Sequence, residues 1–346
     1  LLAIDDIQWI DRASLDLLNH VIDQTRQGGA YPLLICVAHR PVEDSEDEAA
    51  AADRGVAVRS AEPQPHRLLA GCTTLELATL SEAGSLALLE SQLPIARPVL
   101  EEDAAGSTRW QRLKELILKN AQGNPLYIVE MAHALIENYL QYDEASGAYR
   151  ARSDLDRVQV PDTVSRVILS RLDRLDEGSR TMLKVASAIG REFQRWLLQS
   201  VYPYPTQASE IETNLLDLCS KDILDRGQVM YLFRHVMTRE VAYDSLLYAR
   251  RRELHRLIAQ AMEALYADRL DEHAATLARH FAQAGDQARA LIYYSRAAAA
   301  ALDAYANQEA ESLYRSALAL VSAGAHQAPL LSGLGETLYR QGRYEE

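Results

Sequence analysis

The sequence predicts an α/β segment at its start, followed by a chain that is mostly α-helical. Two apolar runs, 1–4 and 33–38, flank a stretch with helical spacing, and this order is typical of parallel strands joined by a helix. After residue 160 apolar residues recur at helical spacing through most of the chain. We expect four regions, 1–80, 81–160, 161–250 and 251–346.

The first region alternates strands and helices. The apolar runs 1–4 and 33–38 read as strands covered on both faces, with Cys36 buried in the second. Between them, 14–25 carries leucine, valine and isoleucine at helical spacing. A further strand is expected at 73–78. These elements together predict part of a parallel sheet.

The second region is predicted to be helical, with a hairpin at its end. Ser81 is placed to begin a helix, and 110–120 forms another helix that stops at Gly123-Asn124-Pro125. The helix 126–137 follows directly. The mixture of Tyr, Asp, Gly and Arg in 139–160 is typical of a hairpin.

The third region is predicted to contain short helices followed by a strand pair. The strands are 223–226 and 229–233, with Gly227 at the turn. Short helices followed by a hairpin have the outline of a winged helix. The expected helices are 162–175, 178–189, 193–201 and 210–221.

The fourth region is predicted to form helical repeats. Between 259 and 320 the chain is rich in Ala, Leu and Tyr and has almost no Gly or Pro. Ala290, Tyr294 and Ala297 have the same spacing as Ala310, Tyr314 and Ala317. The turns at Asn307-Gln308 and Gly342-Arg343 are about one tetratricopeptide period apart, roughly 34 residues. Small residues opposite tyrosines allow adjacent helices to pack closely.

Composition excludes several classes of protein. The 346 residues carry a net charge of −13, which disfavours a duplex-binding surface. The three cysteines are far apart, so we expect a reducing, cytoplasmic location. No apolar stretch is long enough for a membrane helix. Because the chain opens without methionine inside a strand and closes at a helix-to-helix turn, we expect a fragment.

The strand at 1–4 ends in two adjacent carboxylates, Asp5 and Asp6. Parallel α/β sheets bind ligands at the carboxyl edge of their strands, and a carboxylate there can hold Mg²⁺ beside a phosphate. The pattern alone is weak, and taken by itself it favours an ordinary solvated strand end.

Five short segments give the pair a context, because their order and spacing match one family over almost the entire chain. They resemble the Walker B, sensor, Gly-x-Pro, winged-helix and histidine segments of the signal-transduction ATPases with numerous domains (STAND), a branch of the AAA-related P-loop NTPases. The segments are Asp5–Asp11 with Ser14–Leu18, His39-Arg40-Pro41, Gly123–Leu126 with Glu130, Val160–Leu175, and Phe233–Met237 with Val241-Ala242-Tyr243.

In the first region the resemblance implies the later part of a P-loop NTPase core. Asp5 would hold Mg²⁺, Asp6 would orient the attacking water, and Arg40 would face the γ-phosphate. The family commonly has Glu where Asp6 stands, so this shorter acid would reach further. A solvated strand end for Asp5, and a surface arginine before proline for Arg40, are the alternatives.

In the later regions the resemblance implies that Gly123 and Pro125 lie near the base and ribose. It further implies that His235 contacts the β-phosphate of ADP in the resting state. The alternatives are an ordinary break between helices for Gly123 and Pro125, and a core histidine between hairpin and helix for His235.

The chain lacks the phosphate-binding loop of this family. That loop needs Gly-x-x-x-x-Gly-Lys-Ser/Thr, and none of the four lysines here follows a glycine. In the family the loop precedes Walker B, so truncation is the simpler explanation. The parent protein is then expected to be a slow ATPase, and this fragment to be inactive alone.

The resemblance implies a switch that binds ATP or ADP with Mg²⁺ and controls transcription or another signalling output. A protein or small-molecule inducer would act on the repeats, and opening would permit self-association. One alternative is a non-catalytic scaffold whose tetratricopeptide-like repeats hold a protein. Another is a DNA-binding regulator, which the acidic charge and the few basic residues of 210–225 disfavour.

Overall fold

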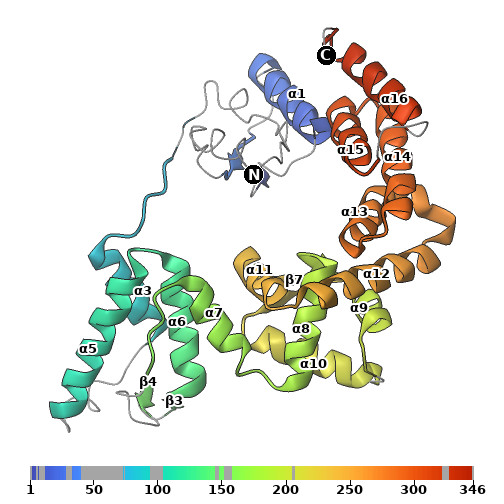
Figure 1. The fold of residues 1–346 in the computed structure, drawn as a ribbon. Helices are drawn as coiled ribbons and strands as arrows, with labels where there is room; N and C mark the ends of the chain where they lie inside the picture. The colour runs from blue at the N-terminus through green and yellow to red at the C-terminus, as the bar shows by residue number, and fades with distance from the viewer. Residues whose placement is uncertain are drawn as a thin grey trace, which may run out of the picture. The chain divides into compact units, whose positions relative to one another are not determined.

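A computed structural model shows that the described residues are mostly helical (Figure 1). They fall into two compact units, 76–261 and 1–75 together with 262–346. The structure describes residues 2–4, 7, 12–28, 33–39, 73, 75–93, 104–144, 148–151, 158–204, 207–321 and 327–344.

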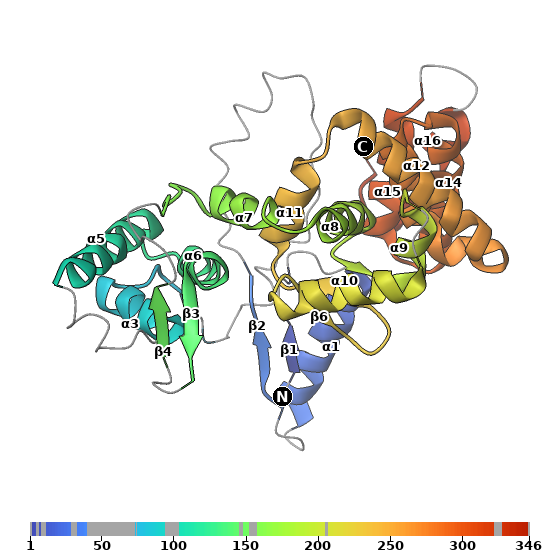
Figure 2. The same ribbon diagram turned by 90° about the horizontal axis from the view of Figure 1, so that it is seen from below.

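The first elements confirm the expected parallel strands joined by a helix. β1 (Leu2–Ile4) pairs in parallel with β2 (Ile35–Val37), and α1 (Arg12–Gly28) connects them (Figure 2). Leu15 and Leu18 of α1 are buried, and the inward side chains of the two strands pack against this helix. This arrangement is common to many α/β folds, so the P-loop assignment stays a proposal.

Two details of the first region differ from the predictions. Cys36 is exposed, because the side chains of β2 alternate and only the half-buried Ile35 and Val37 pack toward α1; among the described residues α1 covers one face of the pair. The strand predicted at 73–78 is wrong for its described residues. There Leu75 and Leu77 are 83% and 94% exposed, with no strand pairing.

Within unit 76–261, three helices form what we call the helical layer. Leu89, Trp110, Ile117 and Leu135 are among the side chains of its core. Ser81 begins the first helix as predicted, since its hydroxyl accepts a hydrogen bond from the Gly84 N–H (3.1 Å). The helices are α3 (Glu82–Gln92), α5 (Ala104–Ala121) and α6 (Pro125–Asn138), followed by the antiparallel hairpin β3 (Leu140–Asp143) and β4 (Ala148–Ala151).

The same unit contains what we call the sheet layer, a three-stranded antiparallel sheet of order β5-β7-β6 with its helices. The predicted strand pair is confirmed, but the two-residue strand β5 was missed. The elements are α8 (Glu177–Ile189), β5 (Glu192–Phe193), α9 (Arg195–Val201), α10 (Ala208–Ser220), β6 (Leu224–Arg226), β7 (Tyr231–Phe233), α11 (Val236–Asp244) and α12 (Tyr248–Leu265).

Helix α7 (Val164–Leu172) joins the two layers, because it packs against α6 and also against α11. Val167 belongs to the core of the helical layer, and Arg171, one turn later on the same face, is also buried. Ile168 and Leu172 are buried on the neighbouring face. The layers are therefore connected by packed side chains as well as by the chain.

The last residues form a series of helices, each packed against the next, and α14 also contacts α16. Ala290, Ala310 and Ala317 are fully buried, as expected for small residues at close helix contacts. The elements are a 3₁₀ segment (Ala267–His273), α13 (Ala274–Ala284), α14 (Gln287–Asp303), α15 (Asn307–Ala319) and α16 (Gln327–Arg340).

Candidate functional site

Three of the six residues predicted to act on nucleotide lie within the described part of the chain. Gly123, Pro125 and His235 all belong to unit 76–261. Asp5, Asp6 and Arg40 lie outside the described residues.

Gly123 has a structural reason to be glycine. Its φ is +78°, a left-handed conformation that side chains disfavour, and a Cβ would lie 2.5 Å from the Leu80 carbonyl oxygen. The Leu80 N–H donates to the Gly123 carbonyl at 2.9 Å. Gly123 is thus buried where the segment before α3 crosses the break between two helices.

The next two residues begin α6. The Asn124 side chain accepts hydrogen bonds from the N–H groups of Leu126 (2.9 Å) and Tyr127 (3.3 Å). Pro125 occupies the first turn, where its missing N–H costs nothing, and it is exposed. The first residue of α6, Pro125, is therefore exposed at the break between the two helices.

His235 lies at the corner between β7 and α11. It is the N-cap residue of α11, and its carbonyl accepts from the Thr238 N–H at 3.1 Å. The imidazole makes no capping bond to the helix, and the residue is half-buried. The imidazole of His235 therefore lies at the positive end of the α11 dipole without capping the helix.

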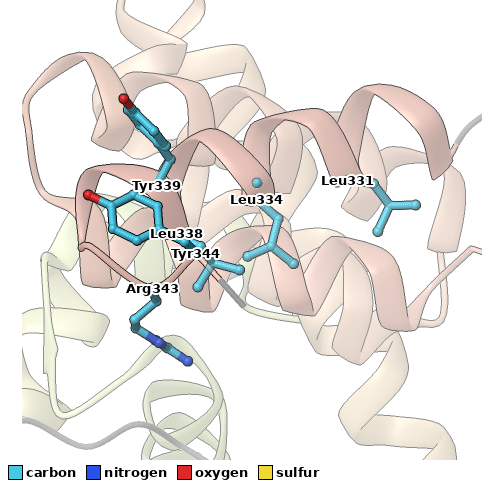
Figure 3. A pocket seen from close by; sticks show the side chains of 7 residues that line it. Leu331, Leu334, Leu338, Tyr339, Arg343 and Tyr344 are labelled. Carbon is cyan, nitrogen blue, oxygen red and sulfur yellow. The ribbon is translucent and has the colours of Figure 1, made fainter. Parts of the chain in front are cut away.

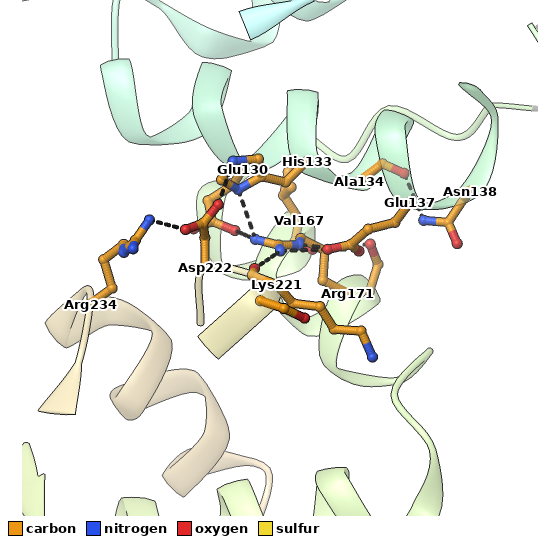
Figure 4. A network of polar contacts seen from close by, with 12 residues as sticks. Glu130, His133, Ala134, Glu137, Asn138, Val167, Arg171, Lys221, Asp222 and Arg234 are labelled. Atoms are coloured by element: carbon orange, nitrogen blue, oxygen red, sulfur yellow. Dashed lines mark hydrogen bonds and ion pairs between the residues drawn. The ribbon is translucent and has the colours of Figure 1, made fainter. Parts of the chain in front are cut away.

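A buried arginine joins the two layers (Figure 4). Arg171 of α7 donates to Glu130 of α6, and the two side chains are 3% and 4% exposed. It also donates to Glu137 (2.6 and 3.4 Å), to the Lys221 carbonyl after α10 (2.8 Å), and meets His133 Nδ1 at 3.4 Å. These contacts use all five N–H donors of the guanidinium.

The charge balance of this cluster favours a charged arginine. Burial works against the Arg171 charge, but the carboxylates of Glu137 and Glu130 outweigh it and raise the pKa of Arg171. Glu130, His133 and Glu137 lie on one face of α6, at spacings of three and four residues. α6 therefore presents two carboxylates and one imidazole to a single cation.

The tautomer of His133 follows from its neighbours. Because arginine has only donors, the Nδ1 atom that faces Arg171 must accept, so the proton of neutral His133 lies on Nε2. Nε2 is 3.8 Å from a carboxylate oxygen of Asp222. Burial, and after it the Arg171 charge, lower the pKa of His133; Glu130, Asp222 and Glu137 act in the opposite direction.

Asp222 continues the network toward His235. It follows α10 in a left-handed conformation with φ +57°. Its carboxylate accepts a hydrogen bond from Arg234, the residue before His235, and Arg234 also donates to Asp225 at 2.7 and 3.1 Å. The bonds to Asp225 and then Asp222 raise the pKa of Arg234. Polar contacts therefore lead from α6 to the corner that bears His235.

We expect the lowered pKa of His133 to make stability depend on pH. Below about pH 6.5 the unfolded chain binds a proton that the native state accepts only at lower pH, so stability falls on acidification. The loss is at most about 1.4 kcal/mol for each pH unit between the two pKa values. His133→Gln keeps an acceptor for Arg171. It should reduce the dependence of the unfolding free energy on pH, measured by urea unfolding from pH 7 to pH 5. An equal dependence on pH in wild type and variant would contradict the lowered pKa of His133.

Sequence reasoning missed the Arg171 network. Glu130 and Arg171 lie in separate segments, and no local pattern pairs residues that are 41 positions apart. One signal was available: Glu130, His133 and Glu137 place polar groups on a predicted helix that is otherwise apolar. Such groups in a buried helix predict a buried partner of opposite charge.

A second candidate site lies on the last helix (Figure 3). An apolar groove on α16 is lined by leucines and tyrosines, and Leu331, Tyr339 and Tyr344 are 52%, 64% and 73% exposed. Arg343 lies at its edge and donates to both carboxylate oxygens of Glu311, at 2.9 and 3.0 Å. The groove therefore offers mainly apolar surface.

The described residues contain no group of three or more His, Cys, Asp or Glu side chains placed to hold a metal ion. The predicted Mg²⁺ ligand, Asp5, lies outside them. None of the helices in the described part of the chain combines the length and the apolar character that crossing a membrane requires.

Comparison with known proteins gives one distant relative and no family model that matches. An uncharacterized protein of Rhizobium meliloti is 25% identical over an alignment of 267 residues, and the alignment covers 75% of this chain. The aligned part is 22% of that protein, so the chain spans about a fifth of the length of the curated relative it matches.

Proposed function

We propose that this chain is part of a nucleotide-dependent signalling switch of the STAND type. The observation that carries the proposal is the position of His235 at the N-terminus of α11, where its imidazole makes no capping bond. Helix N-termini favour anions, because their first N–H groups have no partner within the helix. A phosphate of ADP at this corner would receive bonds from the imidazole and from the start of α11.

The fold supports the proposal at the level of architecture. In the sheet layer the order is helix, strand, two helices and a hairpin, with sheet order β5-β7-β6, and this order is consistent with the proposed winged helix. The stacked helices after residue 262 have the pairing and small-residue contacts of tetratricopeptide-like repeats. The parallel pair β1-β2 with α1 fits a P-loop core.

Two nucleotide states would drive the switch. With ADP bound, His235 and the start of α6 near Pro125 hold the resting arrangement. Exchange for ATP with Mg²⁺ would remove the contact of His235 and favour opening. The nucleotide can bias the two arrangements only because it binds them with different affinity.

The remaining roles belong to residues outside the described part of the chain. Asp5 would hold Mg²⁺, Asp6 would orient water, and Arg40 would contact the γ-phosphate. The Gly-Lys-Ser/Thr loop would come from a preceding part of the intact protein. Hydrolysis is therefore assigned to that intact protein, as a slow ATPase.

The partners in this proposal are those that the family resemblance implies. A protein or small-molecule inducer would bind the helical repeats in the cytoplasm, and opening would permit self-association. Direct binding of DNA by α10 is disfavoured, since Glu210, Glu212 and Asp217 are its only charged residues and DNA phosphates repel them. The signalling output would be control of transcription or of another process, and it would depend on another part of the protein.

Nucleotide retention by the intact protein tests the proposal. We expect purified protein to release ADP on denaturation, measured by anion-exchange chromatography. His235→Ala should reduce the retained ADP by about tenfold or more, because a hydrogen bond to a charged group contributes about 1.5–3 kcal/mol. The exposed histidine in α1 offers a matched control, and His20→Ala should retain ADP as wild type does.

Absence of retained nucleotide in the wild-type protein, together with no binding of added ADP, would remove the switch proposal.

The groove on α16 favours the second candidate function, a scaffold that holds an apolar segment of another protein. On that reading, Leu331→Asp would abolish partner binding and His235→Ala would have no effect.

A further inference from the structure

Asp222 receives contacts from both layers of unit 76–261. From the helical layer, His133 Nε2 of α6 lies 3.8 Å from one carboxylate oxygen. From the sheet layer, Arg234 donates to the other oxygen. One side chain therefore joins a helix to the corner where α11 begins.

The backbone around Asp222 is held independently of its side chain. The Asp222 N–H donates to the Cys219 carbonyl at 3.1 Å, and the Ile223 N–H donates to the Leu218 carbonyl at 3.1 Å. The Arg234 N–H donates to the Ile223 carbonyl at 3.2 Å, which places the corner beside the turn. Changes to the carboxylate can therefore be made without removing the bonds that form the turn.

The neighbouring carboxylate, Asp225, provides a natural comparison. Its carboxylate accepts a hydrogen bond from Arg234 at 2.7 Å, and this ion pair does not involve α6. Asp225 thus holds the corner within the sheet layer. Asp222 holds the corner and also faces the helical layer.

We propose that Asp222 is a joint that couples α6 to the β7–α11 corner and so positions His235. A helix behaves as a rigid element over its length, so a movement of α6 at Pro125 also moves His133, two turns later. Because Asp222 contacts both His133 and Arg234, this movement shifts Arg234, the residue before His235. The role of this coupling in nucleotide switching rests on the proposed function, but the coupling itself does not.

The joint is tested by a double-mutant cycle on His133→Gln and Arg234→Gln, measured by urea unfolding. His133 and Arg234 are linked through Asp222, so their effects should be non-additive by about threefold or more in the unfolding equilibrium constant. Repeated in the Asp222→Asn background, the cycle should become additive. Asparagine tolerates the left-handed conformation, so this variant keeps the turn. In the Asp225→Asn background the non-additivity should persist.

Additive effects in the wild-type background would overturn the joint, as would non-additivity that survives Asp222→Asn. The cycle needs no nucleotide, so its outcome is separate from ADP retention by the intact protein. A coupled cycle in a protein without nucleotide would leave the joint standing and remove the switch. An additive cycle in a protein that retains ADP would remove the proposed role of Asp222 and leave the switch standing.

Discussion

Replacing Arg171 with methionine is expected to destabilise the protein by about 3–5 kcal/mol. The variant leaves the carboxylate of Glu130 buried without its cation, and it leaves the Lys221 carbonyl without its hydrogen bond. Removal of one partner costs more than the net value of an ion pair, because the remaining charge stays out of water. Urea unfolding followed by tryptophan fluorescence measures the loss, since Trp110 lies in the core of the helical layer.

The same helix contains a matched control. Arg166 pairs with Asp162, but these side chains are 68% and 63% exposed, so Arg166→Met should change stability by no more than about 0.5 kcal/mol. Equal effects of the two substitutions would show that Arg171 is solvated rather than buried.

A double variant separates the buried charge from the packing. Arg171→Met together with Glu130→Met removes both members of the buried pair and keeps side chains of similar volume. Because Glu137 is partly exposed, with 27% of its side chain accessible, water can solvate the remaining carboxylate. We expect the double variant to recover most of the lost stability, since apolar replacements of buried pairs are often neutral. A loss equal to the sum of the two single variants would contradict this.

Elements fixed by local chemistry were predicted well from the sequence. Ser81 begins α3 as predicted, and α6 begins at Pro125, one residue before the predicted start, because these boundaries depend on side chains within three residues. The strand predicted at 73–78 was wrong, since a strand requires a partner and its described residues pair with none. β5 was missed for the converse reason. Two residues carry no pattern, and pairing with β7 alone makes Glu192 and Phe193 a strand.

The roles predicted for Gly123, Pro125 and His235 toward a nucleotide stay predictions. The sequence drew attention to Gly123 and His235, and the structure gives both a defined place at a helix start or break. The contact between His133 and Asp222 and the hydrogen bond that Arg234 donates to Asp222 join distant parts of the sequence. No periodicity encodes them, because they depend on how α7 packs between two layers. Local patterns therefore drew attention to single residues but not to the contacts that form the network.

Gly123→Ala is expected to cost about 2–4 kcal/mol, from a left-handed backbone and from the overlap with Leu80. Gln122 is the matched control, because it also has a positive φ of 48°. Gln122→Gly relieves that strain, and stability should stay within about 1 kcal/mol of wild type. A Gly123→Ala variant as stable as wild type would show that an alanine side chain at this position does not overlap with Leu80.

The thermal shift caused by ADP then separates a structural role of Gly123 from a contact with nucleotide. A ligand that binds only the native state stabilises it by RT ln(1 + [L]/Kd), so equal shifts mean equal affinity. If Gly123 only shapes the break before α6, excess ADP should raise the Tm of the intact wild-type protein and of Gly123→Ala by the same amount. A smaller shift in the variant would show that Gly123 itself contributes to nucleotide binding. Because Gly123 is buried against Leu80 whereas Pro125 is exposed, we expect equal shifts for Gly123→Ala and a reduced shift for Pro125→Ala.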